Sequence, residues 1–213
     1  MTLAAFSPAL TEEAATATAG WQLRTGCGHA IDLDVAAWSA PCGPADESVL
    51  ARCLAPTLDI GCGPARFVTA LAHRGVPSLG IDVAPEAVRQ GLSMGATVLL
   101  RSIFDRVPSA GRWATALLMD GNVGIGGDPA ALLGRIAEVL RPRGELLVEV
   151  SEAGTGLVRT SAVLHGPAGA CGAPFPWALA DERAITALAD GAGLDPAASW
   201  TSHGRRFLSV VRR

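Results

Sequence analysis

The chain has 213 residues, of which 49% are hydrophobic and 17% are charged, and its formal net charge is −3. This length suffices for one domain with a sizeable core, and the acidic balance argues against general electrostatic binding of nucleic acid. No apolar run reaches the roughly 18 residues of a membrane-spanning helix, and the N-terminal stretch lacks the basic opening of a secretory signal. We therefore expect a cytoplasmic protein that has neither a membrane nor a nucleic acid as partner.

The five cysteines are odd in number and include no Cys-x-x-Cys pair, which is typical of reduced intracellular thiols. Cys27 and His29 invite interpretation as metal ligands, but no second pair of ligands accompanies them. Structural zinc sites use four protein ligands. We therefore expect no metal site and no disulfide framework, and we interpret Cys27 and His29 as turn residues.

Residues 1–45 are predicted to form a small N-terminal hairpin or lid segment outside the main domain, which spans residues 46–213. The first twenty residues are rich in Ala and Thr and are compatible with a helix, a lid or partial disorder. Two short strands are expected at 21–24 and 30–35, around a glycine turn. After a Pro- and Gly-containing linker, Asp46 is expected to cap the next helix.

The stretch 56–83 has the pattern of a strand, a glycine turn, a helix and a second strand. Residues 57–60 form a short apolar run, and apolar side chains then recur at helical spacing from near Pro64 until Gly75. A second buried strand is expected at 78–82. The pattern predicts a βαβ unit with a ligand-binding loop at its first turn.

The residues of this loop favour a cofactor that contains a nucleoside. Gly61 and Gly63 lack a Cβ atom, so the backbone can turn tightly against a ligand at the positive end of a helix. Asp82 ends the second strand, where a carboxylate can accept hydrogen bonds from ribose hydroxyls. Arg66 occupies the place of the third glycine of a dinucleotide fingerprint, which argues against a nicotinamide cofactor.

The run DIGCGPA at residues 59–65 resembles motif I of the class I, Rossmann-like S-adenosylmethionine-dependent methyltransferases, with Ala65 in the last glycine place. The resemblance implies S-adenosyl-L-methionine as cofactor and S-adenosyl-L-homocysteine as product. It also implies that the loop wraps the methionine and ribose and that Asp82 binds the ribose hydroxyls. A second match is the helix, Leu-x-Pro-x-Gly turn and strand that end at Val150.

The resemblance extends over residues 46–213 and implies an α/β fold. The expected architecture is a doubly wound, seven-stranded, mostly parallel sheet with a C-terminal antiparallel strand pair at 197–202 and 205–211. A glycine-rich loop at 120–127 follows the fourth strand, where open α/β sheets hold ligands. The insertion 157–177, an extra strand followed by a Gly/Pro-rich excursion, is expected to cover the substrate together with the N-terminal hairpin.

Candidate site residues follow from these motifs. Ser102, or Asp105 one turn later, takes the place where the family often has an acidic contact to adenine, and Ile103 is expected to offer a backbone amide and an apolar wall. His165 and His203 are candidate general bases, and Trp38, Phe175 and Trp177 are candidate walls of an acceptor pocket. The candidates for cofactor binding are Asp59, Gly61, Cys62, Gly63, Asp82, Val83, Ser102, Ile103, Asp120 and Asn122.

The expected function is methyl transfer to a small-molecule acceptor by in-line displacement, in which alignment and exclusion of water supply much of the rate. A general base is needed only where the acceptor must lose a proton to become nucleophilic. One alternative is a nicotinamide-dependent oxidoreductase, and another is a non-catalytic, cofactor-binding regulatory protein. A well-formed acceptor cavity over the Asn122 loop would argue against the second alternative. The accepting atom and the oligomeric state remain open.

Overall fold

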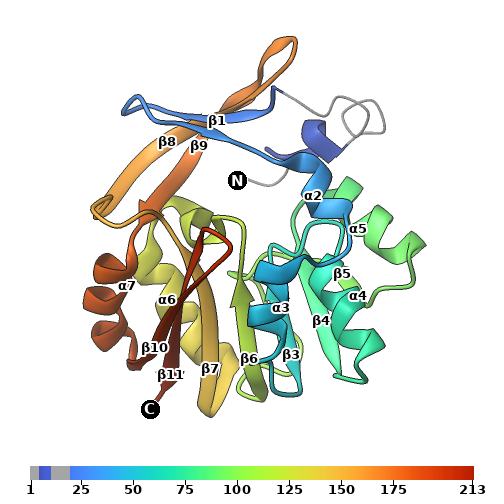
Figure 1. The fold of residues 1–213 in the computed structure, drawn as a ribbon, viewed down its shortest axis with the longest axis vertical. Helices are drawn as coiled ribbons and strands as arrows, with labels where there is room; N and C mark the ends of the chain where they lie inside the picture. The colour runs from blue at the N-terminus through green and yellow to red at the C-terminus, as the bar shows by residue number, and fades with distance from the viewer. Residues whose placement is uncertain (1–4, 11–19) are drawn as a thin grey trace.

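The computed structural model describes residues 5–10 and 20–213, which form two β-sheets and the helices around the larger one (Figure 1). The expectation for residues 1–20 falls mostly outside the described residues. Its described part contains one 3-10 turn, η1 (Ser7–Leu10). None of the described helices has the length and hydropathy needed to cross a membrane.

The main sheet has seven strands in the order β10-β11-β7-β6-β3-β4-β5. Its strands are β3 (Thr57–Ile60), β4 (Ser78–Asp82), β5 (Val98–Leu100), β6 (Trp113–Leu118), β7 (Leu140–Val150), β10 (Leu194–Ser202) and β11 (Arg205–Arg212). Strands β3 to β7 pair in parallel, whereas β11 is antiparallel to both β7 and β10. The predicted seven-stranded sheet with a closing antiparallel pair is therefore confirmed.

Helices cover both faces of this sheet. They are α2 (Val35–Ser39), α3 (Pro44–Leu50), α4 (Arg66–His73), α5 (Pro85–Ser93), α6 (Pro129–Val139) and α7 (Glu182–Ala189), with 3-10 segments η2 (Asn122–Gly127) and η3 (Asp190–Ala192). In β6, Ala116 and Leu118 pack in the core with α6 and α7, whereas Leu117 and the following Met119 pack with α3 and α4. This alternation explains the continuous apolar run of the strand, because both of its faces are buried.

The smaller sheet has four antiparallel strands in the order β2-β1-β8-β9. Its strands are β1 (Gln22–Thr25), β2 (Ala30–Asp32), β8 (Leu157–Gly166) and β9 (Gly169–Ala180). The predicted N-terminal hairpin therefore forms, and it joins the later insertion through the β1–β8 pair, in which Leu23 lies opposite Leu164. Figure 1 shows this small sheet standing over one end of the main sheet.

The prediction of a Gly/Pro-rich excursion after β8 is wrong, because this segment is most of strand β9. Proline cannot donate a ladder hydrogen bond, and it is tolerated on edge strands. Strand β9 lies at the edge of the small sheet, so Pro174 and Pro176 interrupt no second ladder. Pairing with β8 thus overrides the local composition.

Four predicted boundaries are corrected. Val35 begins α2 instead of ending a strand, because Asp34 caps that helix by accepting from the Ala37 N–H. Helix α3 begins at Pro44 after an extended Gly43, so Asp46 lies inside the first turn and is not the N-cap.

Helix α4 starts at Arg66, not near Pro64, because Ala65 has a left-handed backbone (φ 74°). Strand β7 starts at Leu140, where the Leu-x-Pro-x-Gly segment already pairs with Trp113 of β6.

Candidate functional site

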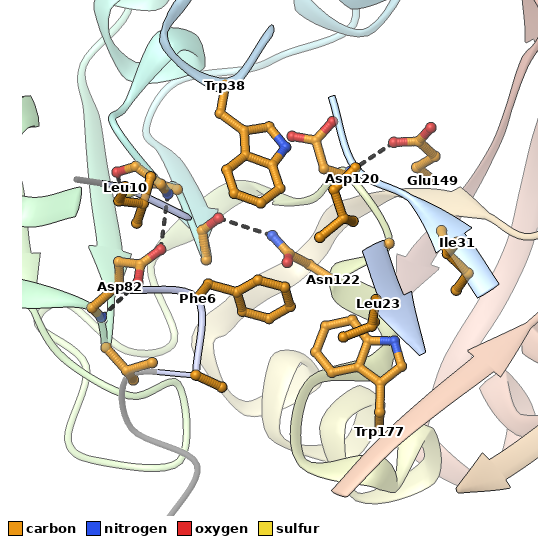
Figure 2. Close-up of a pocket in the computed structure, with 18 of the residues that line it drawn as sticks. Phe6, Leu10, Leu23, Ile31, Trp38, Asp82, Asp120, Asn122, Glu149 and Trp177 are labelled. Atoms are coloured by element: carbon orange, nitrogen blue, oxygen red, sulfur yellow. Dashed lines mark hydrogen bonds between the residues drawn. The ribbon is translucent and has the colours of Figure 1, made fainter. Parts of the chain in front are cut away.

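A cavity of about 270 Å³ lies between the small sheet and the carboxyl ends of β3, β4 and β6 (Figure 2). The chain order of the main sheet reverses between β3 and β6, since β4 lies on the outer side of β3 and β7 on the outer side of β6. Open α/β sheets bind ligands at such a switch point. The cavity is therefore in the place that the topology favours.

The loop after β3 forms one side of the cavity. Gly61 has φ +69°, and a Cβ atom added there would lie 2.6 Å from the side-chain nitrogen of Asn122. Gly63 has φ +54°, again in the left-handed region. Both positions therefore need glycine, which lets the backbone lie directly along the cavity.

Asp82 at the end of β4 holds this loop in place. Its Oδ2 accepts from the Gly63 N–H at 2.8 Å, and its Oδ1 accepts from the Ala84 N–H at 2.8 Å. Burial raises the pKa of Asp82, and the backbone donors partly oppose that effect. The carboxylate lines the cavity, so lone pairs not used by the backbone can accept from a ligand hydroxyl.

Asp59 lies on β3 below the glycine loop and is only 2% exposed. Its Oδ2 has no hydrogen-bond partner among the described residues. Burial raises the pKa of Asp59 to about 7, and the nearby carboxylates of Asp120 and Asp82 add to the shift while Arg66 opposes it. An unpaired buried carboxylate is unfavourable, and Asp59 does not line the cavity.

Two arginines and three carboxylates form an ion-pair network beside the cavity. Arg66 binds Asp120 through two hydrogen bonds of 2.6 and 2.9 Å and also reaches Asp46 at 3.3 Å. Arg205 binds Glu149 at 2.6 and 2.7 Å, and it contacts both Asp46 and Asp120. Asp120 itself has a left-handed backbone (φ 54°), and its N–H donates to Glu149. The network therefore holds a strained residue at the end of β6.

This network was not predicted from the sequence. There, Arg66 only argued against binding of a dinucleotide cofactor. Its members come from α3, α4, β7, β11 and the segment after β6. The sequence shows charged residues next to apolar runs that predict buried strands. No fixed spacing in the sequence connects these five side chains, so their pairing could not be predicted.

Asn122 lies at the centre of the cavity in Figure 2. Its Nδ2 donates to the carbonyl oxygens of Ile60 and Gly61 at 3.0 and 2.9 Å. Because a carbonyl can only accept, these two bonds fix which end of the amide faces the loop. The Oδ1 atom is consequently directed away from the two carbonyl groups, on the side of Phe6.

Aromatic and aliphatic side chains form the opposite wall, here called the roof. It comprises Phe6, Leu10, Leu23, Ile31, Leu33, Trp38, Trp177 and Leu179. The Phe6 ring packs edge-on against Trp38 and Trp177, with centroids 6.0 and 5.6 Å apart. Phe175 supports this cluster from behind at 5.7 Å from Phe6. Trp38 and Trp177 were predicted as walls, whereas Phe6 and the leucines were missed because they come from separate segments.

The structure brings most of the predicted cofactor residues to the cavity. Those that line it are Gly61, Cys62, Gly63, Asp82, Val83, Asp120 and Asn122. Asp59, Ser102 and Ile103 do not line it: Asp59 and Ile103 are buried, and the Ser102 hydroxyl accepts from the Phe104 N–H. A role for these three residues in cofactor binding stays a prediction.

Neither candidate general base lines the cavity. His165 is on β8 opposite Gln22, and His203 is in the β10–β11 turn with its Nδ1 atom 3.1 Å from the Ser202 hydroxyl. Their catalytic role stays a prediction without geometric support. Cys27 and His29 lie in the β1–β2 turn, with Sγ 3.3 Å from Nδ1. The described residues contain no group of three or more side chains that could hold a metal ion.

Comparison with known proteins agrees with this geometry. Residues 58–148 match the family model described as a methyltransferase domain. A search of curated proteins found no match to the sequence.

Solved structures share the fold at low sequence identity. An S-adenosylmethionine-dependent methyltransferase from Bacteroides fragilis, solved with S-adenosyl-L-homocysteine, is 18% identical, with a TM-score of 0.77 over 98% of this chain and 93% of that chain. A methyltransferase from Methanosarcina mazei is 15% identical, with a TM-score of 0.61 over 81% and 99%. The 1,6-didemethyltoxoflavin-N1-methyltransferase of Burkholderia thailandensis is 16% identical, with a TM-score of 0.53 over 78% and 74%.

The matched segment contains the glycine loop, Asp82 and Asn122, and the whole chain has the strand order and closing antiparallel pair described above. Residues 58–148 therefore match a methyltransferase domain, and the chain as a whole has the fold of Rossmann-like methyltransferases.

Proposed function

We propose that this enzyme transfers a methyl group from S-adenosylmethionine to a small molecule held under the small sheet. One observation carries the proposal: a single cavity extends from the glycine loop and Asp82 to the apolar roof. Donor and acceptor must lie together for in-line displacement, so one continuous cavity is the required geometry.

The residues at the sheet edge fit the cofactor. Gly61 and Gly63 present backbone without side chains, and Asp82 offers a buried carboxylate to the ribose hydroxyls. Asp120 and Asn122 line the neighbouring wall, where the methionine portion would lie. The bound cofactor supplies a methyl group activated by a sulfonium, so the protein need only bind, align and exclude water.

The roof supports a small acceptor. It is built from apolar side chains of the N-terminal segment and both hairpins of the small sheet, and it covers the cavity opposite the glycine loop. The Burkholderia neighbour is named as an N1-methyltransferase of 1,6-didemethyltoxoflavin and was solved with that compound bound. A polymer would require an open groove, whereas this cavity is covered.

The alternatives fit less well. A dinucleotide-binding site would need a glycine at position 66. Here the Arg66 side chain forms ion pairs with Asp46 and Asp120, which argues against a nicotinamide-dependent oxidoreductase. A non-catalytic regulator has no need for a cavity that continues from the cofactor loop to an apolar roof.

We keep two further expectations as proposals. The described cysteines are all free, which fits a reducing compartment such as the cytoplasm. The division into an N-terminal lid segment at 1–45 and a methyltransferase domain at 46–213 also remains a proposal, since β1 and β8 join the two in one sheet.

Calorimetric titration with S-adenosylhomocysteine and with NADH tests the function. We expect the wild type to bind S-adenosylhomocysteine and Asp82→Ala to bind it about 100-fold more weakly, as expected for losing two charge-assisted hydrogen bonds. Asp195→Ala, which removes an exposed carboxylate far from the cavity, is the control. Equal affinity of wild type and Asp82→Ala, or preferential binding of NADH, would refute the assignment.

A further inference from the structure

The aromatic and aliphatic lining of the roof favours an acceptor with an apolar ring. Phe6, Trp38 and Trp177 line one wall, and Leu23 and Ile31 lie next to them (Figure 2). The Phe6 ring packs edge-on against Trp38 and against Trp177, so the three rings form one aromatic cluster along the cavity. Aromatic walls of this kind pack well against a planar ring.

The charges at the cavity argue against an anionic acceptor. The charged side chains among the described lining residues are Arg66, Asp82, Asp120 and Glu149. The single cation, Arg66, already binds Asp46 and Asp120. No described cation is therefore free to recognise a carboxylate or phosphate, while three carboxylates would repel one.

Among the described residues, the lining also offers no free general base. All four histidines of the chain lie in the described residues and none lines the cavity, and the sequence contains no lysine or tyrosine. Asp120 and Glu149 are each hydrogen-bonded to arginine, and Asp82 is bound by two backbone N–H groups. An acceptor that must lose a proton before it attacks, such as an alcohol or an alkylammonium, finds no described base here.

On the side of the roof, the Asn122 Oδ1 atom is directed into the cavity and can accept a hydrogen bond. Asn122 is fixed by its bonds to the carbonyl oxygens of Ile60 and Gly61, which orient its Oδ1 toward the space beside Phe6. No hydrogen bond to Oδ1 is made by a described residue. An oxygen of this kind selects a ligand that carries an N–H or O–H donor.

We propose that the acceptor is an uncharged aromatic or heteroaromatic amine, whose ring packs under Phe6, Trp38 and Trp177 and whose N–H donates to Asn122 Oδ1. This inference rests on the proposed function. The nitrogen lone pair forms the new N–C bond as the S–C bond breaks, and the electrons of that bond stay on sulfur. The proton on the positively charged product nitrogen passes to solvent, because an arylammonium is acidic enough to lose it at neutral pH.

The test uses three probes on one ring system: aminonaphthalene, naphthol and naphthoate, with naphthalene as the unsubstituted reference. Each is titrated into the full chain saturated with S-adenosylhomocysteine, and the dissociation constant is measured. We expect aminonaphthalene to bind about tenfold more tightly than naphthalene, a difference typical of one buried hydrogen bond, and naphthoate to bind most weakly. The affinity for naphthol is expected to lie between those for aminonaphthalene and naphthoate.

Two variants separate the contributions of ring and amine. Trp38→Ala should weaken aminonaphthalene and naphthalene alike by about tenfold, because it removes ring contact. Asn122→Ala should reduce the ratio of the naphthalene and aminonaphthalene dissociation constants from about ten to about one. A general loosening of the site would weaken both ligands and leave this ratio unchanged. Trp200→Phe, on the far side of the sheet against Phe207, is the control and should leave every constant unchanged.

Binding of S-adenosylhomocysteine is measured first in every variant. Its absence in the wild type would overturn the proposed function itself. With that binding intact, tightest binding of naphthoate, an unchanged preference in Asn122→Ala, or no binding of any naphthalene probe would each overturn the inference about the acceptor.

Discussion

The two sides of the cavity are built in opposite ways. The donor side consists of Gly61, Gly63 and Asp82, which belong to one βαβ unit and present backbone groups and a carboxylate. The roof collects apolar side chains from the N-terminal segment, β1, β2, α2 and β9. The donor side is thus a local property of the chain, and the roof is a property of the assembled fold.

This difference suggests that the two sides can be altered separately. Polar and backbone contacts on the donor side have strict geometry, because each involves a left-handed glycine or a buried carboxylate. The roof depends on apolar contact, which tolerates substitution better. Changes on the donor side should therefore have the larger effects.

The largest effect is expected for Gly61→Ala. The new Cβ would lie 2.6 Å from Asn122 Nδ2, and the residue would have to keep φ +69°. We expect affinity for S-adenosylhomocysteine to fall about 100-fold, since the loop must shift at the point of contact. Calorimetry measures this directly.

Gly75→Ala is a matched control for that variant. Gly75 also has φ +69°, but no atom lies within 4 Å of its added Cβ. It should lose about 1 kcal/mol of unfolding free energy from the left-handed backbone and keep its affinity. If both variants lost affinity equally, the donor site would not be a local property of the loop.

An intermediate effect, on the pH dependence of the unfolding free energy, is expected for Asp59→Asn. The folded pKa of about 7 lies above the value near 3.9 of an unfolded aspartate. The folded state therefore holds a proton that the unfolded state has lost, and this contribution to stability disappears as pH rises through about 7. Between about pH 5 and about pH 8, the wild type should lose about 2 kcal/mol more unfolding free energy than the variant.

Urea unfolding of both proteins at the two pH values tests this expectation. Asp195→Asn, an exposed carboxylate, serves as the control for the loss of one charge. Parallel pH dependence in wild type and Asp59→Asn would show that Asp59 is ionised in the fold and has found a partner.

The smallest effect on the donor is expected for Phe6→Ala in the roof. Loss of its edge-on contacts to Trp38, Trp177 and Phe175 should reduce unfolding free energy by about 3 kcal/mol, roughly 1 kcal/mol for each pair. Affinity for S-adenosylhomocysteine should stay within about twofold, because Phe6 belongs to the other wall. Leu54→Ala, an exposed side chain elsewhere, is the comparison.

A large loss of S-adenosylhomocysteine affinity in Phe6→Ala would contradict the separation of the two walls. It would mean that the N-terminal segment is part of the donor site. The hydrogen bond that Gln90 donates to the Leu10 carbonyl would then explain how this segment is held beside that site.

The main sheet could be predicted because each of its signals is local. The buried strand at Thr57–Ile60, the glycine turn and the helix after it are contiguous, and the closing pair is joined by a short turn. The loop residues of the site followed for the same reason. Ser102 and Ile103 were placed by resemblance alone, and the structure packs Ile103 into the core, where its carbonyl accepts from Arg135.

The features that escaped prediction depend on distant partners. Strand β9 looked like a loop by composition, and only its ladder with β8 makes it a strand. The role of Arg66 required Asp46, Asp120 and the neighbouring Arg205, which no sequence interval connects.

The sequence by itself determined the Rossmann-like sheet, the donor loop and its carboxylate, because buried strands, left-handed turns and a strand-end acid are encoded within a few residues. Tertiary structure alone decided the acceptor side: it brought Phe6, Trp38 and Trp177 together over Asn122 and kept both candidate histidines away. Apolar side chains carry no local signal of which distant surface they will cover, so that information exists only once the small sheet has assembled.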